Sequence, residues 1–395
     1  MKEHARTGTG PVDGLRGLAI LLVFGYHTWL FSWYTPPPPF DVVARTGYLG
    51  VDLFFLISGF CLYFPYARHA LETSAAQSVR TFAYRRFIKI VPSYLLALAV
   101  TLAVALPAIL SPLESIWPLA QHLLFIENFF DDRFGGVNSV FWSLGIEVQF
   151  YLIFPLLAAI FTPRPLLAAA AMLAAALAYR YGLAGCCIDR EVVMRQLPAF
   201  LDVFAFGMLA AYVFVYVRKH FGEWLLERRF ALTLAALLLV AIAYGLLSSA
   251  NAVQYDLNGR EHWNLAGRSV LAGVMALLIL TSCFGQRWWR FVIGNPALVF
   301  LSVISYNLYL WHTLVELWFV HHNVPPSANP TPHDDDVWKP LFIALSIVVS
   351  VAISAAITYF IERPLLATVR PHSFAFNWRA LLPKPKPPAA PERDT

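Results

Sequence analysis

Charged side chains are scarce in this sequence of 395 residues. Asp, Glu, Lys and Arg together make up 13% of it, whereas hydrophobic residues make up 58% and the mean hydropathy is +0.60. Soluble domains carry roughly 25% charged residues, so this composition excludes an ordinary globular or disordered chain. The four cysteines lack the spacing to histidine that a zinc site needs, and they are too few for a disulfide framework. We therefore expect no structural metal and no redox chemistry.

Long apolar stretches dominate the sequence instead. They run for about 20 residues without the alternation of a membrane β-strand, which is the length that a helix needs to cross a hydrocarbon core of roughly 30 Å. The pattern predicts an all-α, polytopic membrane bundle of about ten helices. The expected spans are residues 15–34, 47–66, 89–110, 141–162, 165–180, 197–217, 230–248, 267–284, 296–320 and 339–361.

Basic residues divide unevenly between the two sets of loops. If the N-terminus is cytoplasmic, most of the 29 Lys and Arg residues fall on the cytoplasmic side, as the positive-inside rule requires. We therefore expect both termini in the cytoplasm and a location in the inner cell membrane. The net charge of +5 then reflects orientation and not nucleic-acid binding. The predicted organisation is a cytoplasmic segment (1–14), a membrane domain (15–366) and a disordered cytoplasmic tail (367–395).

Titratable side chains inside the predicted spans are candidates for function, because a charge at bilayer depth costs about 2.5–3.5 kcal/mol. Arg16 and His27 are 11 residues apart, so they share one helix face and are separated by roughly 16 Å of rise. Arg16 then lies at the cytoplasmic edge and His27 near mid-membrane. Asp52 and Glu147 are predicted at a depth where either carboxylate could meet His27. The alternative is that His27 only packs, and that both acids serve backbone groups or water.

A basic cluster stands at the cytoplasmic entrance of the third span. Arg85, Arg86 and Lys89 are expected in the first turn of that helix, where free backbone N–H groups and the helix dipole favour phosphate. A plain topology signal is the alternative interpretation. Tyr306, Asn307, Tyr309 and His312 form a polar stripe on the ninth span, in which aromatic residues are more often interfacial than ligand-binding.

Six segments together resemble the membrane acyltransferase 3 family in order and spacing. They are Val12–Ile20 (VDGLRGLAI), Gly50–Phe60 (GVDLFFLISGF), Arg85–Tyr94 (RRFIKIVPSY), Phe141–Tyr151 (FWSLGIEVQFY), Ser305–His312 (SYNLYLWH) and Ile361–Pro364 (IERP). The resemblance covers about residues 11–366. It implies ten or so helices and transfer of an acyl group, usually acetyl from acetyl-CoA, to hydroxyls of sugars in exported glycans, glycolipids or secondary metabolites.

The resemblance also implies roles for individual residues. Arg16 and His27 match the family's basic-x10-His motif, in which the histidine is essential. Arg86 and Lys89 match its Arg-x-x-Arg motif, with Lys in place of the second Arg, which loses the guanidinium fork. Glu147 and Glu362 match recurrent acids. The chain is expected to resemble the stand-alone members, which have no appended hydrolase-like domain.

These observations give a mechanistic hypothesis. Arg85, Arg86, Lys89 and Glu362 are expected at the acyl-CoA site, and His27, Arg16, Glu147 and Asp52 at the catalytic site. His27 could deprotonate a sugar hydroxyl or take the acyl group itself, and Glu147 or Asp52 could orient its imidazole. No metal is expected to take part, and the partners are acyl-CoA, a sugar hydroxyl and the lipid bilayer, without nucleic acid.

Two other classes of protein fit part of the pattern. A proton-coupled transporter or flippase of a polar lipid or glycan could use His27, Glu147 and Asp52 as a proton relay. The sequence lacks the internal repeat of many transporters, which disfavours this alternative. A structural or sensory membrane protein that only retains the fold is the second alternative.

Overall fold

The protein is a bundle of long helices. A computed structural model describes residues 10–72, 74, 78–109, 116–130, 138–184, 190–327, 329 and 331–368. Within these residues every regular element is helical, and ten segments are long and apolar enough to cross a membrane. The structure thus confirms the predicted all-α bundle of about ten membrane helices.

The ten candidate spans follow the predicted ranges, and several consist of consecutive helices. Their elements are α2 (Gly10–Ser32); α3 (Phe40–Thr46), η1 (Gly47–Leu49) and α4 (Gly50–Glu72); α5 (Val79–Ile109); α7 (Phe141–Phe161); α8 (Pro165–Ala184); η4 (Leu197–Phe200) and α10 (Leu201–His220); α12 (Arg229–Val253); α13 (Leu257–His262), η5 (Trp263–Gly267) and α14 (Arg268–Phe284); α15 (Arg287–Ile293) and α16 (Pro296–His321); α17 (Trp338–Ile357), η7 (Thr358–Glu362) and α18 (Arg363–Ala367). Shorter helices outside the spans are α6 (Ile116–Leu123), η2 (Glu127–Phe129), α9 (Arg190–Val193), α11 (Gly222–Glu227) and η6 (Pro332–Asp334).

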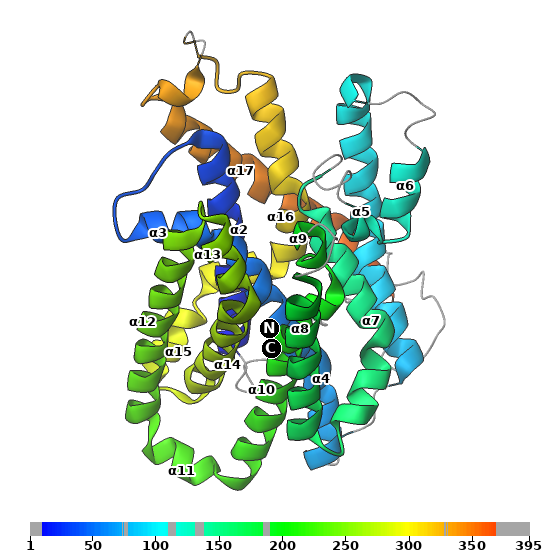
Figure 1. Ribbon diagram of the computed structural model, residues 1–395, viewed down its shortest axis with the longest axis vertical. Coiled ribbons are helices and arrows are strands. Elements are labelled where there is room, and N and C mark those ends of the chain that lie inside the picture. Colours follow the sequence, from blue (N-terminus) through cyan, green and yellow to red (C-terminus); the bar gives the residue numbers. More distant parts are fainter. Residues whose placement is uncertain are drawn as a thin grey trace, which may run out of the picture.

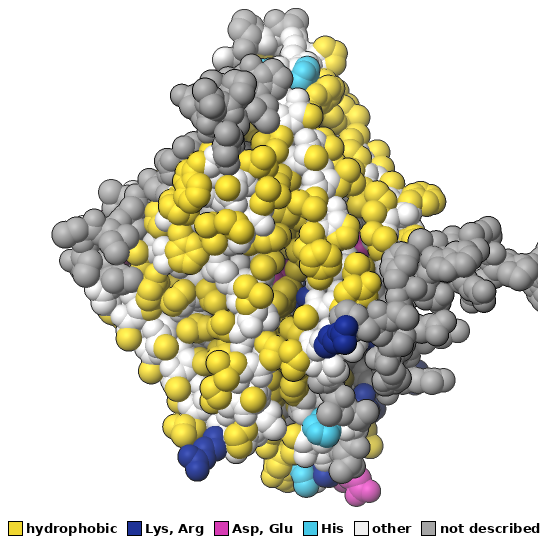
Figure 2. Space-filling view, turned by 90° about the vertical axis from the view of Figure 1, so that its right-hand side faces the viewer, with side chains coloured by type: hydrophobic (Ala, Val, Ile, Leu, Met, Phe, Trp, Pro, Cys, Tyr) yellow, Lys and Arg dark blue, Asp and Glu magenta, His cyan; other side chains and the backbone are white. Residues whose placement is uncertain are grey.

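Large apolar side chains cover the outside of the bundle. Leu152, Leu166 and Phe360 are 78%, 72% and 81% exposed, which in water would expose an extensive apolar surface. Figure 2 shows one face that is largely apolar, with its described charged side chains mainly toward the lower part. Such a surface suits contact with lipid chains, so the chain is a multi-pass membrane protein.

Helix α2 runs through the middle of the bundle, beside α4 and α16 (Figure 1). Two glycines allow α2 to approach the start of α16 and the preceding α15 closely. A Cβ atom at Gly14 would lie 1.7 Å from the carbonyl oxygen of Ile293, and one at Gly17 would lie 2.0 Å from that of Leu298. Since lipid supplies no hydrophobic drive between helices, close packing of small residues holds such pairs together.

Helix α16 has a well-defined start. The Asn295 side chain accepts a hydrogen bond from the Leu298 backbone N–H at 3.0 Å, and Pro296 occupies the first turn, where its missing N–H does no harm. The helix then continues for 26 residues and buries Asn307, His312 and Glu316 completely. Polar side chains that are fully buried in a membrane bundle need hydrogen-bond partners, and neighbouring helices such as α2 and η7 supply them.

The orientation in the membrane stays a prediction. Ten crossings would place the two ends of the described chain on the same side. Residues 1–9 and 369–395 lie outside the described residues, as does most of the predicted disordered tail. Helix α2 begins at Gly10, so the predicted boundary between the cytoplasmic segment and the membrane domain falls inside a helix.

Candidate active site

Two histidines from distant parts of the sequence meet between α2 and α16. His27 Nδ1 lies 2.9 Å from the Val23 carbonyl oxygen and 3.1 Å from His312 Nε2. His312 Nδ1 lies 2.9 Å from the Leu308 carbonyl oxygen, and the His312 side chain is fully buried. The imidazole rings are 4.9 Å apart and nearly perpendicular.

These contacts assign the protons of the pair. A carbonyl oxygen only accepts, so each Nδ1 carries the proton that is donated to the helix backbone. When both rings are neutral, His312 Nε2 has a lone pair and accepts from the His27 Nδ1–H, which it shares with Val23. His27 Nε2 then also has a lone pair. The network therefore leaves His27 Nε2 as a base and uses His312 to hold the tautomer.

Further polar contacts surround the histidine pair. The Thr28 hydroxyl donates to Glu316 Oε1 at 2.5 Å, next to His27 on α2 and one turn after His312 on α16. The segment just before α7 also contacts α16, since the Thr313 hydroxyl donates to Asn138 Oδ1 at 2.9 Å. Contacts from three separate stretches of the chain thus stabilise the site.

Glu147 lies on α7 but has partners other than His27. Its Oε1 accepts from the Ser58 hydroxyl at 2.8 Å and from the Tyr151 hydroxyl. The guanidinium of Arg86 lies 5.4 Å from the centre of the Tyr151 ring. Glu147 is therefore associated with the basic residues of α5, and the hypothesis that it accepts the second imidazole N–H is not supported by its contacts.

Asp52 belongs to a buried group of charges away from the histidine pair. Its carboxylate forms an ion pair with Arg268 at 2.8 Å. Arg180 pairs with Asp202 in the same region, and the Ser269 hydroxyl also donates to Asp202 at 2.5 Å. Buried charges require such partners. The contacts give Asp52 a structural ion pair and provide no support for its orienting His27.

Arg86, Lys89 and Glu362 come together as the sequence suggested. Lys89 forms an ion pair with Glu362, which also accepts from Asn307 Nδ2 at 2.9 Å. Arg86 lies over the Tyr151 ring at 5.4 Å, and Arg16 on α2 is within electrostatic range of both Lys89 and Tyr151. Arg16 therefore belongs to this basic cluster, which we define as Arg16, Arg86 and Lys89.

Two donors of the basic cluster are available for a ligand. Arg16 Nε and Arg86 Nε are buried and have no hydrogen-bond partner within the described part of the chain. A buried donor without an acceptor is costly, and a guanidinium matches the geometry of a phosphate. Arg85, in contrast, is exposed on another face of α5. The arrangement suits an anion that contacts Arg16 and Arg86.

The expected position of the basic residues at a helix start is wrong. Helix α5 begins at Val79, so Arg86 and Lys89 lie two or three turns inside it, where backbone N–H groups already donate within the helix. Hydropathy marks where a helix enters lipid and not where the helix begins. Any anion at this cluster is therefore held by side chains.

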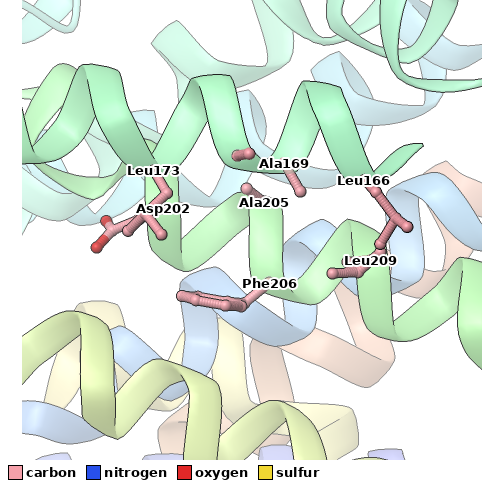
Figure 3. A pocket seen from close by; sticks show the side chains of 8 residues that line it. Leu166, Ala169, Leu173, Asp202, Ala205, Phe206 and Leu209 are labelled. Atoms are coloured by element: carbon pink, nitrogen blue, oxygen red, sulfur yellow. The ribbon is translucent and has the colours of Figure 1, made fainter. Parts of the chain in front are cut away.

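The described residues contain no group of three or more His, Cys, Asp and Glu side chains that could hold a metal ion. A groove of about 200 Å³ lies between α8 and α10, with Leu166 and Leu209 at one end and Asp202 at the other (Figure 3). Its other lining residues are apolar and Asp202 is already paired with Arg180, so we assign no chemistry to it.

Sequence analysis missed the role of His312 and did not single out Thr28 or Glu316. His312 was included only in a polar stripe, because nothing in the sequence shows that the ninth span touches the first. The available signal was the i, i+4 spacing of His312 and Glu316 within an apolar span, since two titratable groups on one face of a membrane helix are rarely without function.

The fold and the site define an integral membrane protein in which helix α2 carries both a member of a partly buried histidine pair and a member of a basic cluster. A family model described as an acyltransferase domain matches residues 11–359. The chain belongs to this family of membrane acyltransferases.

Individual relatives agree with the family. A protein of Staphylococcus aureus (strain MRSA252) named "Putative O-acetyltransferase" is 24% identical, over 93% of this chain and 58% of its own length. The chain therefore spans little more than half of that relative. "Peptidoglycan O-acetyltransferase OatA" of Listeria monocytogenes is 30% identical over 39% of this chain and 24% of its own. "Acyltransferase MdmB" of Streptomyces mycarofaciens is 33% identical over 37% of this chain and 38% of its own. No solved structure matches.

Proposed function

We propose that the protein transfers an acyl group, acetyl from acetyl-CoA, to a hydroxyl of a sugar in an exported glycan, glycolipid or glycosylated metabolite. The observation that carries this proposal is the histidine pair, which leaves His27 Nε2 free to accept a proton. The family and the names of the relatives support acyl transfer to oxygen. The choice of acetyl-CoA and of a sugar acceptor rests on the resemblance and on the chemistry of the two sites.

The basic cluster is proposed to bind the donor. Acyl-CoA is an anionic nucleotide of the cytoplasm, and Arg16 Nε and Arg86 Nε are buried donors without acceptors in the described chain. Lys89, held by Glu362, adds positive charge beside them. Arg16 and His27 are separated by roughly 16 Å along α2, a distance of the same order as the arm that joins the nucleotide to the thioester.

His27 is proposed to act as the general base. His27 Nε2 removes the proton of the acceptor hydroxyl while the hydroxyl oxygen bonds to the thioester carbonyl carbon. The tetrahedral intermediate then breaks its C–S bond, and the proton on Nε2 passes to the departing thiolate sulfur. His312 Nε2 accepts the Nδ1–H throughout and stabilises the imidazolium. Base catalysis of this kind contributes about 10²- to 10⁴-fold in rate.

A covalent route uses the same atoms. His27 Nε2 attacks the thioester carbonyl carbon and the C–S bond breaks, releasing the thiolate. The acceptor hydroxyl then attacks the acyl-imidazole; as the C–N bond breaks, the hydroxyl proton passes to the released Nε2 and from there to the thiolate sulfur. Both routes require Nε2 to be unprotonated and to face the donor, so both follow from the same tautomer.

The test of this function is product formation. Membranes that contain the protein are incubated with acetyl-CoA labelled with ¹⁴C in the acetyl group, and glycan, lipid and small-molecule fractions are counted. We expect label in one fraction that is absent from membranes without the protein. A transporter or flippase would leave every fraction unlabelled, and that result would refute the proposal.

A further inference from the structure

The buried carboxyl of Glu316 takes no part in the proposed mechanism. Glu316 has no exposed surface, and its Oε1 accepts a hydrogen bond from the Thr28 hydroxyl at 2.5 Å. Thr28 is itself only 6% exposed. Burying two polar side chains costs free energy, so a pair that is retained inside a membrane bundle points to a function.

The Thr28–Glu316 pair lies directly beside the two histidines. Thr28 directly follows His27 on α2, and Glu316 follows His312 by one turn on α16, so both contacts cross the same helix interface. The Thr101 hydroxyl, for comparison, donates to the carbonyl four residues earlier in its own helix. The Thr28 hydroxyl instead joins two helices.

The two ends of the α2–α16 interface are held differently. Near the start of both helices, Gly14 and Gly17 bring α2 against the backbone of Ile293 and Leu298. At the histidine end, side chains hold the two helices together: the Phe24 and His312 rings lie 5.6 Å apart, and the His27–His312 and Thr28–Glu316 hydrogen bonds cross the interface.

We propose that Thr28 and Glu316 are positioning residues that set the distance between His27 and His312. This inference rests on the proposed function, because it gives the pair a purpose in acyl transfer. The His27 Nδ1–His312 Nε2 contact is 3.1 Å long, and a shift of about 1 Å would break it. Displacements of that size can lower catalytic rates about 10²-fold. Glu316 Oε1 is the atom that matters, since it accepts the hydrogen bond from Thr28.

Paired substitutions test this role. Thr28→Val and Glu316→Leu remove the hydrogen bond, whereas Thr28→Ser and Glu316→Gln keep a donor and an acceptor. Activity is the release of CoA thiol from acetyl-CoA by the purified full chain with an extract of host membrane lipids and glycans. We expect the Val and Leu variants to lose at least about tenfold in kcat with little change in KM for acetyl-CoA. The Ser and Gln variants should stay within a fewfold of wild type.

A matched control separates positioning from packing. Thr101 is buried like Thr28, but its hydroxyl bonds only to its own helix, so Thr101→Val should leave kcat unchanged. The double variant Thr28→Val/Glu316→Leu should be no slower than either single variant, because both remove one interaction. Equal kcat for Thr28→Val and Thr28→Ser, or an equal loss in Thr101→Val, would overturn the proposal.

A second readout does not depend on activity. The rate at which diethyl pyrocarbonate modifies His27 is followed by peptide mass spectrometry. We expect several-fold faster modification in Thr28→Val and Glu316→Leu than in wild type, Thr28→Ser or Thr101→Val, because the imidazole is no longer held. An unchanged rate would refute the positioning role even if acyl transfer stands. Absence of any transfer by wild type would refute the proposed function and leave this test valid.

Discussion

His312 Nε2 lies 3.1 Å from His27 Nδ1, although the two residues are 285 positions apart in the sequence. This contact fixes which nitrogen of His27 holds a proton. It predicts that His312→Leu lowers kcat by about 10- to 100-fold, because the imidazole of His27 loses the group that orients it. His312→Gln, which can still accept a hydrogen bond, should retain more activity.

The control for His312 is another buried histidine. His122 is 1% exposed and its Nδ1 contacts only the Pro118 carbonyl, at 2.8 Å, in the described structure. His122→Gln should therefore have nearly wild-type kcat in the same CoA-release assay. If His312→Leu were as active as His122→Gln, the assigned tautomer would have no catalytic role.

The second prediction concerns the basic cluster. Arg86→Ala should weaken binding of acetyl-CoA about tenfold or more, because it removes a buried charged donor from the proposed phosphate site. Arg85→Ala is the matched control, since Arg85 is exposed on another face of the same helix. Isothermal titration of each purified variant with acetyl-CoA, and with adenosine 3′,5′-bisphosphate, measures the two Kd values. Equal affinities for the two variants would mean that the cluster serves only as a topology signal.

The third prediction concerns Lys89 and Glu362. The Glu362 side chain is 4% exposed and the Lys89 side chain 23%, so Glu362→Ala would leave a largely buried charge without its partner. Removing one member of a buried ion pair lowers the free energy of unfolding by about 3–5 kcal/mol. Because Lys89 is partly exposed, we expect a loss near the lower end of this range. Thermal unfolding in detergent should show a clear fall in Tm. The double variant Lys89→Met/Glu362→Gln should recover part of the lost Tm. A Tm below that of Glu362→Ala would contradict the account.

The fourth prediction is that stability varies with pH because of Glu127, which lies in the short helix η2 outside the candidate spans. Glu127 is 3% exposed, and neither carboxylate oxygen has a hydrogen-bond partner among the described residues. Burial raises the pKa of this carboxyl from 4.5 to about 8. Between these two values the folded protein keeps a proton that the unfolded chain loses.

The sign of the effect follows from linkage. The contribution of Glu127 to the free energy of unfolding is largest below pH 4.5, the pKa of this carboxyl in the unfolded chain. It is lost as the pH rises through about 8, the pKa in the folded protein. Glu127→Gln should remove this fall and raise Tm, by little at pH 5 and by more at pH 8. Parallel Tm curves for wild type and Glu127→Gln across this range would show that the carboxyl does not titrate as described.

Much of the fold could be predicted from the sequence, because lipid imposes a simple rule. A helix must remain apolar for about 20 residues to cross the hydrocarbon core, so each span is visible in isolation. The start of α5 was missed because polar residues such as Arg80 and Arg85 continue a helix readily outside the apolar stretch.

The site was less predictable, because its contacts depend on which helices are neighbours. The motifs singled out Arg16, His27, Arg86 and Lys89, yet depth alone suggested that Asp52 and Glu147 meet His27. Asp52 instead pairs with Arg268, and His27 with His312. Depth along a helix follows from counting residues, whereas the direction in which a side chain points around the bundle is decided by packing.

The most direct test of the central claim is acetyl transfer by a His27 variant. Purified wild type, His27→Gln and Arg85→Ala are incubated with acetyl-CoA labelled in the acetyl group and with an extract of host membranes, and the labelled product is quantified. The account predicts labelled product from wild type and Arg85→Ala, and a loss of about 10²-fold or more in His27→Gln. Labelled product formed by His27→Gln at the wild-type rate would contradict it.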